Sequence, residues 1–123
     1  MKADVEVWLK QANRDYKSAT NSLKSNDYYV ACLLSQQAVE KALKFLHLLK
    51  GKELLRIHDL VKLAREINAP DDLIEKCAKI NPVYVEVRYP EGSEMPAEKV
   101  NKKEAQEILE LSREILRWVK KQI

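Results

Sequence analysis

The sequence has few of the residues that interrupt helices. Its 123 residues include two glycines and four prolines, and 46% of the residues are hydrophobic. This composition argues against disorder and low complexity. There is no glycine-rich phosphate loop, no H-E-x-x-H pattern and no G-x-S-x-G pattern, so the common signatures of nucleotide hydrolases, zinc proteases and serine hydrolases are absent. The length suffices for one core, and we predict a single domain over residues 1–123.

Cysteine, histidine and charge of one sign are also scarce. Cys32 and Cys77 lie far apart, and the two histidines show no ligand spacing. We therefore expect two buried free thiols, no metal site and no cofactor. The net charge of +3 comes from 22 basic and 19 acidic residues. These charges are interspersed along the sequence, so the net charge alone does not indicate nucleic-acid binding.

Long hydrophobic runs are absent. No stretch approaches the ~18 apolar residues that a bilayer span needs. The first ten residues, "MKADVEVWLK", carry charges where a signal peptide has its apolar segment. We therefore expect a cytoplasmic protein that does not associate with membranes.

Apolar residues recur at steps of three and four, which is the period of amphipathic helices. The second helix is apolar around most of its circumference, which predicts a central position. The segment "VYVEVRYP" alternates like a strand, but a single strand would have no sheet to join, so we predict a helical continuation there. The preceding "NP" (81–82) can kink or restart that helix. The result is an all-α, up-and-down bundle of four long helical segments plus a short helix. The predicted helices cover residues 3–24, 28–50, 58–68, about 70–87 and 101–122, with a loop over 88–100.

Four residues are expected to mark helix ends. Asn26 or Asp27 can cap the second helix. Gly51 can take the left-handed conformation that follows a helix C-terminus. Asn101, with Glu104 three residues later, resembles a capping box at the start of the last helix.

The apolar second helix also carries a polar stripe. Helical spacing places Gln36, Glu40, Lys44 and His47 in one row, with Gln37 and Lys41 beside it. Glu40 and Lys44 form an i, i+4 pair in the favourable order. The stripe is either the solvated edge of a nearly buried helix, or the lining of a cleft or subunit interface that meets polar groups from elsewhere.

Four further residues carry chemistry. His58 and Asp59 read as a base with its orienting carboxylate or as a helix cap, and helical geometry favours the cap, because adjacent helical side chains diverge by about 100°. Arg88, followed by Tyr89, can bind phosphate beside a ring that stacks on a base. An arginine at a helix C-terminus can equally interact with the last carbonyls. The residues alone leave this choice open and stop short of an activity.

The segments "QQAVEKALKFL" (36–46), "HDL" (58–60) and "RYP" (88–90), in this order, resemble the HEPN domain family. The likeness extends from "WLKQANRDYKSA" (8–19) to the last helix. It implies a helical bundle, commonly a symmetric dimer, in prokaryotic and archaeal companions of minimal nucleotidyltransferases. Many such pairs are toxin–antitoxin modules. Members of the wider superfamily are metal-independent ribonucleases that use an arginine and a histidine four to six residues later.

The sequence departs from that ribonuclease pattern. Arg88 matches the arginine, but no histidine follows it anywhere in the chain. We therefore expect no catalytic residues and a non-enzymatic protein, because an arginine cannot transfer protons near neutral pH. His58 would replace the missing histidine only if the fold brought it beside Arg88, and no spacing indicates that.

Three hypotheses remain. The first is a homodimeric subunit that binds a minimal nucleotidyltransferase and the phosphate of a nucleotide or RNA. The second is a ribonuclease toxin that uses Arg88, and the third is a helical dimer with a purely structural stripe. The dimer is expected because Leu111 and Trp118 flank the core stripe of the last helix as exposed apolar residues. The candidate binding residues are Gln37, Glu40, Lys41, Lys44, His58, Arg88 and Tyr89.

Overall fold

The computed structural model describes residues 1–123, and its regular structure is helical, as predicted. Three helices are long and three are short. They are α1 (Ala3–Lys24), α2 (Tyr28–Leu49), α3 (Leu60–Glu66), α4 (Asp71–Ile80), α5 (Val83–Glu86) and α6 (Lys102–Lys121), with a 3₁₀ turn, η1 (Pro96–Glu98), in the loop before α6.

The predicted fourth long segment restarts after Asn81–Pro82, where a kink or a restart was expected. α4 ends at Ile80, and α5 starts again at Val83 as a single turn. Pro82 explains the break, because proline has no N–H to donate to the preceding turn. The helical prediction for "VYVEVRYP" is confirmed at its first four residues, which form α5 rather than a strand.

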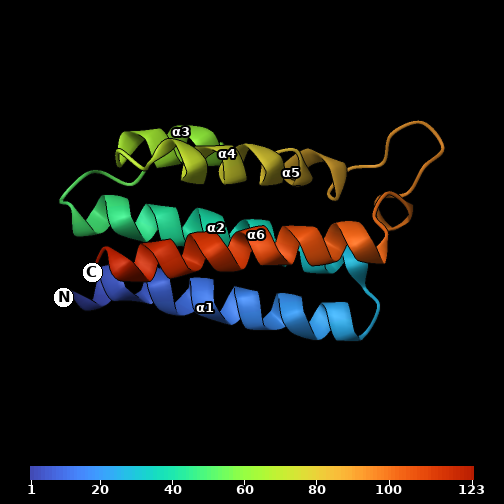
Figure 1. The fold of residues 1–123 in the computed structure, drawn as a ribbon, viewed down its shortest axis with the longest axis horizontal. Coiled ribbons are helices and arrows are strands. Elements are labelled where there is room, and N and C mark those ends of the chain that lie inside the picture. Colours follow the sequence, from blue (N-terminus) through green and yellow to red (C-terminus); the bar gives the residue numbers. More distant parts are fainter.

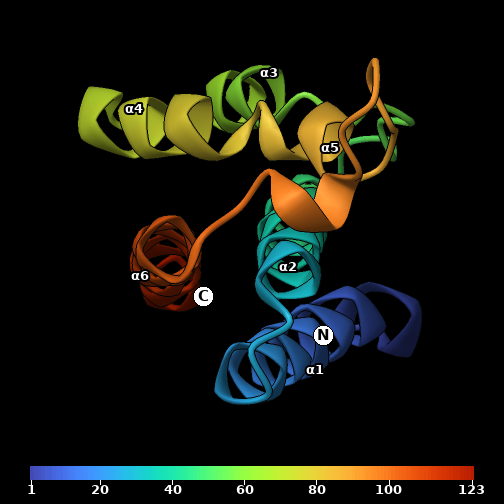
Figure 2. The same cartoon turned by 90° about the vertical axis from the view of Figure 1, so that its right-hand side faces the viewer.

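Helix α2 lies at the centre of the molecule, as its apolar circumference predicts. It packs against α1, α6, α3 and α5. Viewed end-on, α2 lies between α1 and the layer of α3, α4 and α5, and α6 lies beside α2 (Figure 2). Leu43, Phe45 and Leu46 of α2 are at most 1% exposed, and each contributes about 1.5–3 kcal/mol through burial. Both termini lie at one end of the bundle, and the 88–100 loop lies at the other (Figure 1).

The helix ends follow most of the expected signals. Asn101 caps α6 by accepting a hydrogen bond from the Glu104 N–H at 2.9 Å. Gly51, with φ +76°, follows the end of α2 in the left-handed conformation. The prediction of a side-chain cap on α2 is wrong: Asp27 stands at the N-cap position, but its side chain makes no capping hydrogen bond.

Two further expectations are corrected. The short helix begins at Leu60, two residues later than predicted, so His58 lies in the segment before α3. Leu111 and Trp118 are only partly exposed, because both pack against the main core. No helix combines the length and hydropathy that a bilayer span requires.

Candidate functional site

Helix α2 carries a buried carboxylate with three hydrogen-bond donors around it. Oε1 of Glu40 accepts from Nε2 of Gln36 at 3.1 Å and from Nδ1 of His58 at 3.0 Å. Its Oε2 atom accepts from Nζ of Lys44 at 3.2 Å, which confirms the predicted i, i+4 pair. Gln36, Glu40 and Lys44 are at most 6% exposed. The reading of this row as a solvated edge is therefore wrong: the row meets a polar group from another segment.

His58 is held in one tautomer by this carboxylate. Because Glu40 can only accept, Nδ1 of His58 carries the hydrogen, and Nε2 is the ring nitrogen left free. The side chain of His58 is 49% exposed. The structure thus supplies the pairing of a base with an orienting carboxylate, but through Glu40 rather than the adjacent Asp59.

Asp59 is a helix cap, as predicted for this pair of residues. Its Oδ1 atom accepts from the N–H groups of Val61 and Lys62 at 3.0 and 3.2 Å and from Nδ2 of Asn81 at 2.9 Å. The Asn81 hydrogen bond, helped by the two N–H groups and opposed by partial desolvation, holds the pKa of Asp59 below its ordinary value. The cap fixes the start of α3 and, with it, the position of His58.

Tyr84 connects His58 to Arg88. The His58 and Tyr84 rings stack with centroids 4.3 Å apart and an interplanar angle of 16°. The Cζ atom of Arg88 lies 4.4 Å from the centroid of the same tyrosine ring. Nε of Arg88 is buried and has no hydrogen-bond partner in the chain. The side chains of His58 and Arg88 therefore contact the same tyrosine ring. We call Glu40, Lys44, His58, Tyr84 and Arg88 the Arg88 cluster.

Sequence reasoning missed Tyr84. The signal was present in the i, i+4 spacing of Tyr84 and Arg88, which places the two side chains on one face of a helix. Tyr89 was the tyrosine expected to act with Arg88. Tyr89 is 55% exposed, and its carbonyl oxygen accepts from Nζ of Lys99 at 3.3 Å. No ring contact joins Tyr89 to the Arg88 cluster.

The predicted lysines do not act together. Lys41 pairs with Asp15 of α1, and Nε2 of Gln11 donates to the other Asp15 oxygen at 2.8 Å. The charge of Lys44 is matched by Glu40. The expectation that Lys41 and Lys44 join Arg88 in supplying free positive charge is corrected, because only the arginine lacks a carboxylate partner.

Two other polar residues of the stripe make hydrogen bonds within the protein. Gln37 extends the hydrogen-bond chain by donating to Oε1 of Gln36 at 2.7 Å. His47 is 1% exposed, and its Nε2 lies 3.0 Å from the carbonyl oxygen of Leu63. That contact requires a hydrogen on Nε2, so His47 joins α2 to α3 by donating this hydrogen bond.

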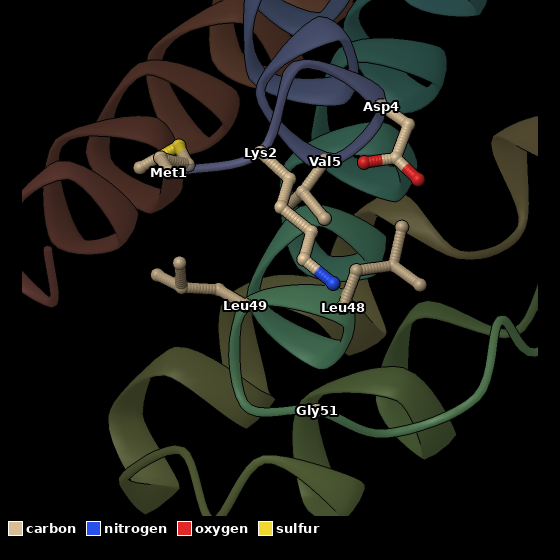
Figure 3. Close-up of a pocket in the computed structure, with 7 residues that line it drawn as sticks. All are labelled: Met1, Lys2, Asp4, Val5, Leu48, Leu49 and Gly51. Atoms are coloured by element: carbon tan, nitrogen blue, oxygen red, sulfur yellow. The ribbon is translucent and has the colours of Figure 1, made fainter.

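The cluster can bind an anion and hold a proton. The opposite charges of Lys44 and Glu40 cancel, so the cluster keeps the one positive charge of Arg88. A protonated His58 would add a second positive charge. No three histidine, cysteine, aspartate or glutamate side chains come together as metal ligands. The largest cavity, about 410 Å³, lies elsewhere, between the start of α1 and the end of α2. Leu48, Leu49 and Val5 line it with Lys2 and Asp4 (Figure 3), an arrangement without a convergent set of reactive groups.

Comparison with known proteins defines the class. The HEPN domain model matches residues 5–122, so the chain belongs to the HEPN domain family. TT1696 from Thermus thermophilus is 32% identical, with 99% of this chain and 100% of that chain covered and a TM-score of 0.92. ST0689, an archaeal HEPN homologue, is 36% identical over 99% and 98% of the two chains, with a TM-score of 0.83. Among curated proteins, none matches this sequence.

A HEPN domain protein from Thermotoga maritima has the same fold. Its identity is 23%, the coverage is 93% of this chain and 94% of that chain, and the TM-score is 0.75. The predicted family and the predicted helical fold are therefore both confirmed.

Proposed function

We propose that the protein is a non-catalytic, homodimeric HEPN subunit that binds the phosphate of a nucleotide or RNA through the Arg88 cluster. One observation carries the binding proposal: Nε of Arg88 is buried beside Tyr84 without a hydrogen-bond partner. A buried donor without an acceptor is costly, and a phosphate oxygen that displaced the atoms covering Nε would satisfy it with a charge-assisted bond. When His58 is protonated, its Nε2–H group is a second donor beside the same tyrosine ring.

The partner that we propose is a minimal nucleotidyltransferase, in a toxin–antitoxin pair. This part of the proposal rests on the family, whose members are commonly encoded beside such enzymes. Co-expression with the neighbouring reading frame, followed by size-exclusion chromatography and intact-mass measurement, tests it. Co-elution or an added nucleotide mass is expected. Finding neither would favour a dimer whose polar stripe is purely structural.

The phosphate proposal is tested by comparing two arginine variants. Arg88→Gln removes the guanidinium of the cluster, whereas Arg65→Gln makes the same change at an exposed position of α3. Isothermal titration with ATP and with pyrophosphate should show about tenfold or greater weakening for Arg88→Gln, the loss of roughly 1.5–3 kcal/mol expected for a hydrogen bond to a charged group. Equal affinities for both variants would remove Arg88 from the binding site.

A second candidate, metal-independent RNA cleavage, is favoured by one specific observation. His58, oriented by Glu40, reaches the same tyrosine ring as Arg88, which supplies a proton-carrying group where sequence spacing indicated none. In this mechanism Nε2 of His58 would take the proton of the ribose 2′-hydroxyl as the 2′-oxygen bonds to phosphorus. The bond from phosphorus to the 5′-oxygen would break, and that oxygen would take a proton from water. Arg88 would stabilise the charge on the phosphate oxygens.

The two candidates differ in one assay. Under the leading proposal, purified protein cleaves single-stranded RNA no faster than a mock preparation. Cleavage that is abolished by both Arg88→Ala and His58→Ala, in variants whose circular dichroism is unchanged, would establish the second candidate instead. Cleavage that survives both changes would indicate a contaminating nuclease.

A further inference from the structure

Helix α6 separates two grooves of opposite charge. The groove on the α4 side contains a cavity of about 310 Å³ lined by Lys79, Glu107, Glu110, Leu111 and Glu114. The groove on the α1 side contains a cavity of about 230 Å³ lined by Asn13, Tyr16, Arg113, Leu116, Arg117 and Lys120. We call the second one the basic groove. Charges that alternate along the sequence are thus sorted by helical geometry onto two sides of one helix, and no carboxylate lines the basic groove.

Two cations of the basic groove have no ion-pair partner, and the third keeps some of its donors free. Arg117 and Lys120 have no carboxylate within 4.0 Å. Arg113 donates Nε–H and one terminal N–H to Glu110, at 3.0 and 2.6 Å. A guanidinium has five N–H donors, so about three remain on Arg113 for another acceptor.

The remaining walls suit an anion as well. Leu116 is 4% exposed and forms the apolar floor of the basic groove. The side-chain amide of Asn13 supplies a neutral donor. The Tyr16 hydroxyl lies 3.4 Å from the Leu109 carbonyl oxygen, to which it donates. Burial raises the pKa of Tyr16, although Arg113 opposes this, so the phenol remains neutral and adds no negative charge to the groove.

We propose that the basic groove binds a run of phosphate groups, which is an anion class separate from a single phosphate. Arg113, Arg117 and Lys120 follow one another by four and three residues on one helix. At 1.5 Å per residue they span about 10 Å along the axis of α6, more than one phosphate occupies. The cavity is smaller than the roughly 300–1,000 Å³ typical of pockets that enclose whole ligands. A linear chain of phosphates along α6 can contact all three cations, whereas a single phosphate cannot span them, and the small cavity excludes only a larger, enclosed ligand.

The basic groove is independent of the phosphate contact proposed for Arg88. It lies between α1 and α6, across α2 from the layer that carries α3 and α5 (Figure 2). Loss of one site therefore leaves the other intact, and the two proposals can fail separately.

The experiment measures the binding of two probes. One is a fluorescent oligouridylate about 12 nucleotides long, and the other is tripolyphosphate. The double variant Arg117→Gln/Lys120→Gln removes two cations from the groove. Its matched control, Lys102→Gln/Lys103→Gln, removes two exposed cations from the first turn of the same helix. The groove variant should bind at least about tenfold more weakly at low salt. Its slope of log K against log salt should fall by about 1.4, which corresponds to two contacts on a single strand. The control should bind like the parent protein.

The probes and a competitor separate the outcomes. Oligouridylate binding that depends on the groove identifies a nucleic-acid strand as the source of the phosphates, and binding of tripolyphosphate alone identifies a free polyphosphate. The proposal is overturned if the two double variants weaken binding equally, since net charge would then explain the effect. It is also overturned if polyglutamate competes as well as the phosphate probes do, or if Arg88→Gln rather than the groove variant abolishes binding.

Discussion

Glu40 is the residue on which the polar interior of α2 depends. It is 5% exposed and accepts hydrogen bonds from Gln36, Lys44 and His58. Its replacement by glutamine keeps the shape but leaves the ammonium of Lys44 buried without a counter-charge. We expect Glu40→Gln to lower the free energy of unfolding by about 3 kcal/mol in urea denaturation, because breaking a buried pair leaves an uncompensated charge.

The matched control is Glu6→Gln. Glu6 also pairs with a lysine four residues later, at 3.8 Å, but on the exposed surface of α1. Its loss should change the free energy of unfolding by less than about 1 kcal/mol. If the two variants lost equal stability, burial of the Glu40–Lys44 pair would have no energetic importance.

Asp59 gives a pH-dependent prediction. Asp59→Ala should cost about 1 kcal/mol of unfolding free energy at pH 7, the usual value of an N-cap. The pKa of Asp59 is depressed in the folded protein below its ordinary value of 3.8, chiefly by the Asn81 hydrogen bond. Its contribution is therefore complete above pH 3.8 and is lost as the pH falls through the lower, folded pKa. Chemical denaturation of both proteins from about pH 7 to about pH 2 should show the difference shrinking only at the acid end. A constant difference would contradict this.

Residue-level prediction succeeded where partners are close in sequence. The Glu40–Lys44 pair and the Asn101 cap follow from spacings of four and three residues. The His58–Tyr84 stack and the Lys41–Asp15 pair join residues 26 apart, so they depend on how helices pack. No local pattern encodes that packing, and the proximity of His58 to Arg88 was missed for the same reason.

At the scale of elements, Asn81 links the end of α4 to the start of α3. Its Oδ1 atom accepts from the Leu60 N–H at 2.9 Å, and its Nδ2 atom donates to Asp59 at 2.9 Å. Asn81→Ala should lower the free energy of unfolding by about 2 kcal/mol, since the Leu60 N–H loses its acceptor.

Hydrogen exchange at the Leu60 amide reports this link directly. Exchange should accelerate in Asn81→Ala and remain unchanged in Asn13→Ala, which alters an exposed asparagine on α1. Unchanged protection of Leu60 in both variants would show that the α3–α4 connection is held by apolar packing alone.

The ends of a helix were predictable where its apolar repeat extends over many turns. α1 and α2 begin and end within a residue of expectation, because each carries more than five turns of apolar repeat. The short elements were less predictable. α3 starts only after Asp59 because that side chain caps it, and the fourth segment divides at Asn81–Pro82. Single residues decide both boundaries, and periodicity does not detect them.

At the scale of the whole molecule, we predict a homodimer. Leu111 and Trp118 are only partly exposed and do not support the dimer. On α5 and in the following loop, however, Val85, Tyr89 and Met95 are 50% to 56% exposed. Three exposed apolar side chains on the segment that carries Arg88 favour association through that segment. Light scattering at micromolar concentration should give about twice 14.3 kDa.

A pair of charge insertions locates the dimer contact. Val85→Glu should shift the scattering mass to that of the monomer, whereas Val7→Glu, at a valine that is 53% exposed on α1, should leave a dimer. A parent protein that scatters as a monomer would exclude the dimer, and dissociation by Val7→Glu alone would move the contact to α1.

The position of the two chain ends has a practical consequence. Both lie at the end of the bundle opposite the 88–100 loop (Figure 1). An affinity tag or fluorescent reporter fused at residue 1 or residue 123 would therefore extend away from α5 and that loop. Fusion proteins of either orientation can be immobilised on a sensor surface with the loop end of the molecule facing the solution, so capture chemistry need not interfere with measurements on Arg88 or Val85.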